Sequence, residues 1–174
     1  KAIREQCSAF NPEGLDEYLK KEEKIYNTKA FEYIREIETY FKMDFKEKLE
    51  AFYGNNWFKK GVPSKIGESA TILMYQKNRE VEDEDDECTE WDCINIIAYR
   101  EIALKNWQNI FETSYTRPHE KKMAGGKDAK TSWMVRLEKL RNQNFHSYYV
   151  TEDDYYFLEQ LYDWLIMKKD DVYE

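Results

Sequence analysis

Arg141, Asn142 and His146 are the residues whose types and spacing could support chemistry in this sequence. On a helical wheel that starts at Leu137, Arg141 falls inside the apolar arc, about 40 degrees from Leu137. Because burying an unpaired guanidinium is very costly, Arg141 must meet a carboxylate or face a cleft in which an anion binds. An imidazole such as that of His146 can transfer protons near neutral pH.

The spacing of these three residues limits how they can act together. Asn142 and His146 share one side of an intact helix, whereas Arg141 and His146 diverge by about 140 degrees. Their convergence requires the helix to loosen near Phe145, or a second copy of the chain to complete the site. A histidine near a helix C-terminus is also stabilised by the helix dipole, so a purely structural explanation of His146 stays open.

The elements that must position this site are predicted to be helices. Only 3 Pro and 6 Gly interrupt the 174 residues, which favours long helices over a sheet with many turns. The length fits a single domain over residues 1–174. We expect an all-α, up-and-down bundle of about five to seven helices. Its core should be rich in aromatic rings, since the sequence contains 14 Tyr, 9 Phe and 5 Trp.

Helix boundaries follow from capping residues and apolar spacing. Starts are expected at Asn11-Pro12, Asn27-Thr28, Val62-Pro63-Ser64 and Thr151, with a break at Gly54-Asn55-Asn56. One or two helices should cover residues 94–111, and another should run from about Ala129 to Asn144, burying Trp133, Met134, Leu137, Leu140 and Asn144. Residues 80–92 carry nine acidic side chains and should form a solvated loop. A calcium site or an RNA-mimicking autoinhibitory segment are the alternatives for this stretch.

Several classes of protein are disfavoured by composition. The three cysteines, Cys7, Cys88 and Cys93, make an odd, irregular set, which indicates a reducing cytoplasm and ordinary thiols. A zinc site of Cys88, Cys93 and His119 is the less favoured alternative, because the spacing matches no paired-ligand pattern. No cofactor and no membrane segment are expected. The chain begins at Lys1 without Met, so we expect a domain excised from a larger protein, with that protein's other domains as partners.

Charge is distributed unevenly along the chain. The whole sequence carries a net charge of −8, yet between Arg117 and Arg141 eight basic residues face three acidic ones, a local net of +5. A basic stretch on an otherwise acidic protein is typical of a protein that binds RNA at one place on its surface. The candidate RNA-binding residues are Lys121, Lys122, Lys127, Lys130, Arg136 and Lys139. A lysine-rich solvated loop without a ligand is the alternative.

The run Arg-Asn-x-x-x-His, followed by one amphipathic helix, resembles the signature of HEPN ribonucleases. The stretch from Leu137 to Asn142 and the segment Thr151-Glu152-Asp153-Asp154 are similar to the end of that family. Gly54-Asn55-Asn56-Trp57, Gly61-Val62-Pro63 and Asn106-Trp107 through Phe111 resemble the HEPN branch fused to RNA-surveillance and antiviral-defence proteins. The resemblance covers residues 45–167, after N-terminal helices over 1–44. Phe145 departs from it, because relatives often have a small residue there.

The resemblance implies metal-independent cleavage of RNA. The 2′-hydroxyl attacks the adjacent phosphorus and leaves a cyclic phosphate and a 5′-hydroxyl. His146 would transfer protons, Arg141 would stabilise charge on the phosphoryl oxygens, and Asn142 would orient the phosphate or the histidine. Relatives build this site across a two-fold homodimer. The alternatives are a catalytically silent HEPN module that dimerises or binds RNA or nucleotide, and a structural domain whose motif is coincidental.

Overall fold

A computed structural model describes residues 14–122, 124–144 and 150–167, and every regular element in these ranges is a helix. The predicted all-α class is therefore confirmed. Five helices have ten or more residues: α2 (Leu15–Tyr53), α4 (Ser64–Asn78), α5 (Ile96–Lys105), α8 (Ser132–Asn144) and α9 (Glu152–Tyr162). None of the helices in this part of the chain is both long and apolar enough to cross a membrane.

Three one-turn helices connect the longer ones, and with them the described residues contain eight α-helices, more than the expected five to seven. These are α3 (Trp57–Gly61), α6 (Glu112–Tyr115) and α7 (Lys127–Lys130). A π-helical turn, Trp107–Phe111, joins α5 to α6, and a second one, Asp163–Met167, follows α9. The helix expected from Ala129 is divided at Thr131, whose buried hydroxyl donates to the Lys127 carbonyl at 2.9 Å.

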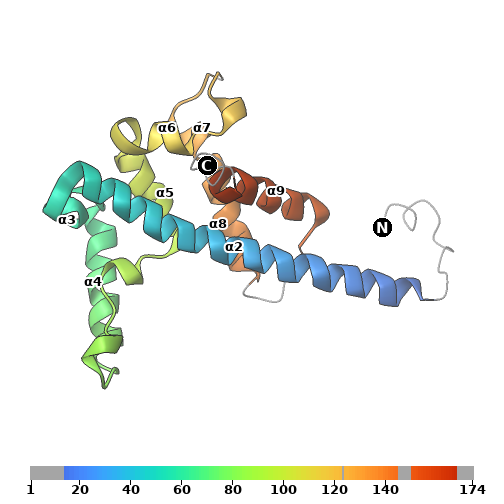
Figure 1. Cartoon of the computed structure of the whole chain (residues 1–174), viewed down its shortest axis with the longest axis horizontal. Coiled ribbons are helices and arrows are strands. Elements are labelled where there is room, and N and C mark those ends of the chain that lie inside the picture. The colour runs from blue at the N-terminus through green and yellow to red at the C-terminus, as the bar shows by residue number, and fades with distance from the viewer. Residues whose placement is uncertain (1–13, 123, 145–149, 168–174) are drawn as a thin grey trace.

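Helix α2, with 39 residues, runs along the long axis of the structure (Figure 1). Helices α3, α5, α8 and α9 all pack against it, whereas α4 projects away from its axis. The predicted helix start at Asn27-Thr28 is wrong, because α2 is continuous there. The Thr28 hydroxyl bonds the Lys24 carbonyl at 2.9 Å within the helix. The Asn27 side chain accepts a 2.9 Å hydrogen bond from the Val150 N–H instead of capping a helix.

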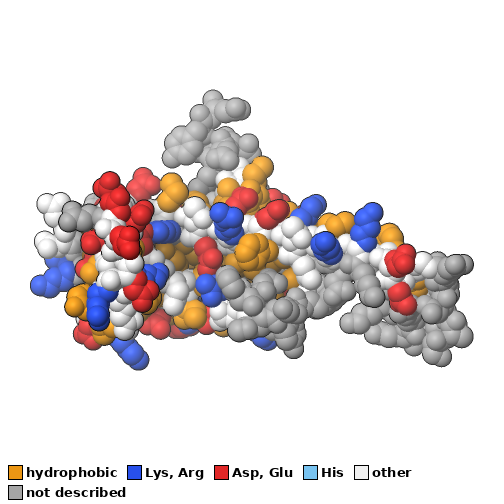
Figure 2. Space-filling model, turned by 90° about the horizontal axis from the view of Figure 1, so that it is seen from below, with side chains coloured by type: hydrophobic (Ala, Val, Ile, Leu, Met, Phe, Trp, Pro, Cys, Tyr) orange, Lys and Arg blue, Asp and Glu red, His pale blue; other side chains and the backbone are white. Residues whose placement is uncertain are grey.

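The acidic stretch lies at the end of the molecule from which α4 projects, where red side chains gather in Figure 2. Its side chains from Glu80 to Glu87, where described, are mostly exposed, as predicted for a solvated loop. Near the end of the stretch, Trp91 is buried and donates from Nε1 to the Lys42 carbonyl at 2.9 Å. Asp92 forms an ion pair with Lys42, so the loop is attached to α2 at its C-terminal side.

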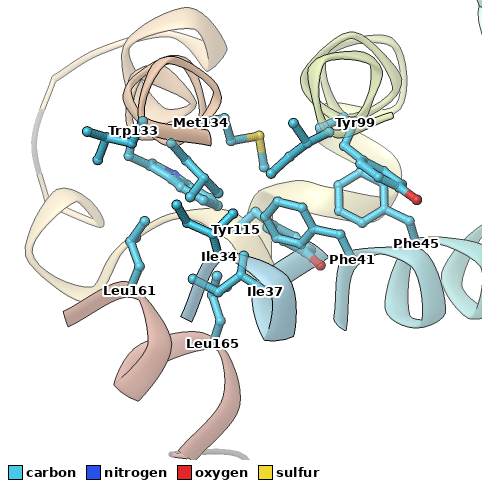
Figure 3. Close-up of a cluster of buried hydrophobic side chains, with 14 of the residues drawn as sticks. Ile34, Ile37, Phe41, Phe45, Tyr99, Tyr115, Trp133, Met134, Leu161 and Leu165 are labelled. Carbon is cyan, nitrogen blue, oxygen red and sulfur yellow. The ribbon is translucent and has the colours of Figure 1, made fainter. Parts of the chain in front are cut away.

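The core is rich in aromatic rings, as predicted, and is shown in Figure 3. Phe45 of α2 stacks on Phe111 with 4.3 Å between ring centroids, and Tyr99 and Tyr115 meet it edge-on. Other core side chains come from four segments: Ile34, Ile37 and Phe41 from α2, Trp133 and Met134 from α8, Leu161 from α9, and Leu165 from the turn after it. Burial of these large apolar surfaces is the main stabilising term of the fold.

A carboxylate lies inside this core and is matched by donors. Asp44 of α2 is only 8% exposed, and it accepts a hydrogen bond of 2.6 Å from the Tyr115 hydroxyl. Lys48, one turn further along α2, donates to its other oxygen at 2.6 Å. Burial and the negative charge of Asp44 raise the pKa of Tyr115 well above its ordinary value, so the phenol remains a donor. This pairing compensates the cost of burying a charge.

Replacing Tyr115 with Phe should therefore destabilise the fold without leaving a cavity. The change removes one hydrogen bond to a buried carboxylate, and we expect the free energy of unfolding to fall by about 1–3 kcal/mol. Denaturant unfolding followed by circular dichroism measures this difference. Tyr75→Phe is the matched control, since that ring is 66% exposed and its change should have no measurable effect. Equal unfolding midpoints for the two variants would contradict this account of Asp44.

Candidate functional site

Helix α8 carries the first two residues of the candidate site. The helical wheel is confirmed for its apolar side, because Trp133, Met134, Leu137 and Leu140 are all buried. This side packs against α2 and α5. The side chain of Asn144 lies outside the described residues. The buried stripe fixes the rotation of α8 about its own axis, and so sets the direction in which Arg141 projects.

Arg141 meets a carboxylate, the first of the two alternatives that its apolar setting allows. Its Nε donates to Oε1 of Glu38 on α2 at 3.2 Å. The two side chains are 31% and 30% exposed, so the pair lies at the edge of the core. Asn142 beside it is partly buried. The guanidinium is therefore held by α2 while part of it remains accessible from solvent.

Glu38 is a site residue that the sequence analysis did not identify. It follows the buried Ile37 and precedes the buried Phe41, so it lies beside the apolar stripe of α2. Its charge also reaches Tyr99, whose pKa is raised mainly by burial and further by Glu38. An acidic residue beside a buried stripe was a usable signal, because such a position calls for a cationic partner. The partner's identity depends on how α2 and α8 pack.

His146 and Phe145 lie outside the described residues. The convergence of His146 and Arg141, through a loosened helix near Phe145 or a second copy of the chain, therefore stays a prediction. Of the three motif residues, the structure describes Arg141 and Asn142, which lie in the last turn of α8. Helix α8 packs against α2.

The six candidate RNA-binding residues differ in their surroundings. Lys121, Lys122 and Lys139 are exposed. The other three interact within the chain. Lys127 donates to the Leu104 carbonyl at 3.1 Å, and Lys130 pairs with Glu112 at 2.9 Å, which lowers the pKa of that carboxyl.

Arg136 is the most constrained of the six basic residues. Its guanidinium pairs with Asp154 at 2.8 Å, donates to the Asp153 carbonyl and lies 4.2 Å from the ring centre of Phe157. These contacts attach α8 to the start of α9, so Arg136 stabilises the packing of these two helices.

The lysine-rich segment 121–130 precedes α8, whereas Arg141 lies in the last turn of that helix. Helix α8 begins at Ser132, and the helical rise places Arg141 about 14 Å further along the axis. Closeness in sequence therefore does not make one continuous basic patch around Arg141. Of the six candidates, Lys139 is the exposed one nearest to Arg141 along the chain.

The ligands of the alternative zinc site are divided between two places. The sulfur atoms of Cys88 and Cys93 are 3.6 Å apart, and burial raises the pKa of Cys93. Cys93 lines a groove between α4 and α5, whereas His119 lines a different cavity against α9. Among the residues that the structure describes, no group of three His, Cys, Asp or Glu side chains has an arrangement suited to a metal ion.

Comparison of the chain with protein-family models, with curated proteins and with solved structures gives no match. The resemblance to HEPN ribonucleases therefore rests on the sequence motifs alone. The structure adds an all-helical fold in the described residues, and an Arg141 that is both anchored and partly exposed.

Proposed function

We propose that this chain is a metal-independent endoribonuclease domain that cleaves RNA with Arg141, Asn142 and His146. In this proposal it has the HEPN-like fold, works as a two-fold homodimer and is the effector of a larger stress or antiviral-defence protein. The observation that supports the proposal best is the setting of Arg141. A guanidinium that is held by Glu38 on a neighbouring helix, yet 31% exposed, is oriented before a phosphate arrives.

The proposed reaction is a transesterification within the RNA strand. The 2′-oxygen attacks the adjacent phosphorus while its proton passes to a base, and His146 is the candidate for this transfer. The bond from phosphorus to the 5′-oxygen breaks, and that oxygen takes up a proton. Arg141 stabilises the negative charge that grows on the non-bridging oxygens. The products are a 2′,3′-cyclic phosphate and a 5′-hydroxyl.

One observation favours a second candidate, a catalytically silent module that dimerises or binds RNA or nucleotide. Glu38 already compensates the charge of Arg141, which is what a purely structural arginine at the edge of a core requires. The two candidates differ in whether Arg141 acts on RNA beyond its contact with Glu38.

Cleavage by this mechanism should persist in EDTA and give cyclic phosphate ends, or the 3′-phosphate formed when they hydrolyse. We expect His146→Ala to slow cleavage by roughly 10²- to 10⁴-fold, the usual contribution of acid–base catalysis. Gel assays with end-group analysis measure both effects. Products with 3′-hydroxyl ends, or a folded His146→Ala protein that cleaves at the normal rate, would rule out the mechanism.

The pair of variants Arg141→Gln and Glu38→Gln separates catalysis from structure, because each breaks the same ion pair. In the nuclease, Arg141→Gln should lower the cleavage rate by about 10²- to 10³-fold, as loss of an oxyanion donor does. Glu38→Gln should keep the rate within about tenfold, since the arginine remains. Both should lose no more than about 1 kcal/mol of stability, because the pair is partly exposed. Equal losses of activity would identify Arg141 as structural.

The dimer is tested by mixing Arg141→Ala with His146→Ala chains, each inactive alone. If Arg141 and His146 act from opposite chains, each heterodimer has one intact site and one doubly altered site. With random pairing, an equal mixture should recover roughly a quarter of the wild-type rate. Light scattering at the assay concentration is the control for association. A monomer that cleaves RNA, or a stable dimer whose mixtures stay inactive, would exclude the shared site.

A further inference from the structure

A cavity of about 330 Å³ lies between the turn Pro118–Glu120 and the side of α9, away from Arg141. The ring of Trp164 lies at its wall and packs edge-on against Trp133, with 5.3 Å between centroids. Because Trp133 is near the start of α8, the cavity is at the end of this helix opposite to Arg141.

Polar atoms at this cavity lack partners within the described part of the chain. Arg117, which lines it, pairs through Nη2 with Glu120 at 2.6 Å, yet its Nε is buried without a hydrogen bond. The second carboxylate oxygen of Glu120 is also buried and unsatisfied. An unmet buried donor or acceptor costs about 1–3 kcal/mol, so this ion pair keeps unused hydrogen-bonding capacity next to the cavity.

The rest of the lining combines aromatic and aliphatic side chains with polar ones. Trp164 and Phe157 supply the aromatic part, and the Phe157 ring is already covered on one side by the guanidinium of Arg136. His119, Gln160 and Asp163 add an imidazole, an amide and a carboxylate, and all three are at least partly exposed. Aromatic rings beside hydrogen-bonding side chains are the usual receptors for unstacked bases of single-stranded RNA.

The charged residues near the cavity indicate which base it would prefer and which residues would contact the neighbouring phosphates. A carboxylate such as Asp163 accepts hydrogen bonds, so it favours a base edge with adjacent N–H donors; guanine has two such groups, and uracil has a single one. Lys121 and Lys122 follow Glu120 directly and are exposed, so they are the candidates for contacts with the phosphates that flank the base.

We propose that this cavity binds an unpaired guanine base of single-stranded RNA, with Trp164 as the stacking surface and Asp163 as the acceptor for the base edge. The proposal deepens the proposed function, because it gives the nuclease a recognition site for its substrate. It does not require cleavage, since base binding and bond breaking use opposite ends of α8.

The test measures binding of GMP and UMP to the full chain by titration calorimetry. GMP should bind at least about tenfold more tightly than UMP, since a well-placed pair of hydrogen bonds to a base is worth about 1–3 kcal/mol. Asp163→Asn should reduce this preference by about tenfold, and Trp164→Leu should weaken both nucleotides. Glu152→Gln, which changes an exposed acid in the first turn of α9, is the matched control. If Trp164→Leu fails to fold, the exposed Asp163→Asn variant still decides the question.

Binding of an RNA strand is measured with an oligonucleotide of uridines that contains one guanosine. The His146→Ala protein is used so that cleavage does not interfere. This oligonucleotide should bind more tightly than oligouridine, and Lys121→Gln with Lys122→Gln should reduce the salt slope by about 0.7 for each lost phosphate contact.

Equal affinity for GMP and UMP overturns the proposal. Binding of GMP without any preference among oligonucleotides overturns its RNA-strand part. Guanine binding without cleavage rejects only the nuclease, and cleavage without guanine binding rejects only this site.

Discussion

Phe41 and Phe45 of α2 determine where the other helices can lie. Phe41 is within 6.0 Å, between ring centroids, of Tyr99, Tyr115 and Trp133, which come from α5, α6 and α8. Contacts among rings have preferred distances and angles, so they restrict neighbouring helices more than aliphatic contacts do. Because both phenylalanines lie on one helix, the positions of the elements that meet them are fixed relative to α2.

The candidate site depends on the same contacts. Glu38 lies between Ile37 and Phe41 along α2, and Arg141 follows Leu140 in α8, so each member of the ion pair is next to a buried side chain. The rigid core therefore fixes the backbone on both sides of the pair. A guanidinium held in this way loses little conformational freedom when it binds an anion, which is the physical advantage of building a site on helices instead of loops.

Local signals in the sequence predicted the ends of helices and the buried side of α8. The helix start at Thr151 is confirmed, since its hydroxyl accepts a hydrogen bond from the Asp154 N–H, and α4 begins directly after Pro63. The continuity of α2 through Asn27 could not be predicted, because that side chain is used by Val150, far away in the sequence. Glu38 as the partner of Arg141 and the internal pairing of Lys130 with Glu112 are likewise tertiary contacts. Spacing along the chain carries no information about them.

The distribution of cations limits how an RNA strand can lie on this acidic protein. Lys130, Arg136 and Arg141 are each paired with a carboxylate within the chain, whereas Lys121, Lys122 and Lys139 are exposed. The rise of about 14 Å along α8 from Ser132 to Arg141 corresponds to roughly four stacked nucleotides at about 3.4 Å each. If a base occupies the proposed site beside α9, a single strand of about this length along α8 would reach Arg141. A rigid duplex has no unstacked base to place in the cavity, so the proposed site would select single strands by shape.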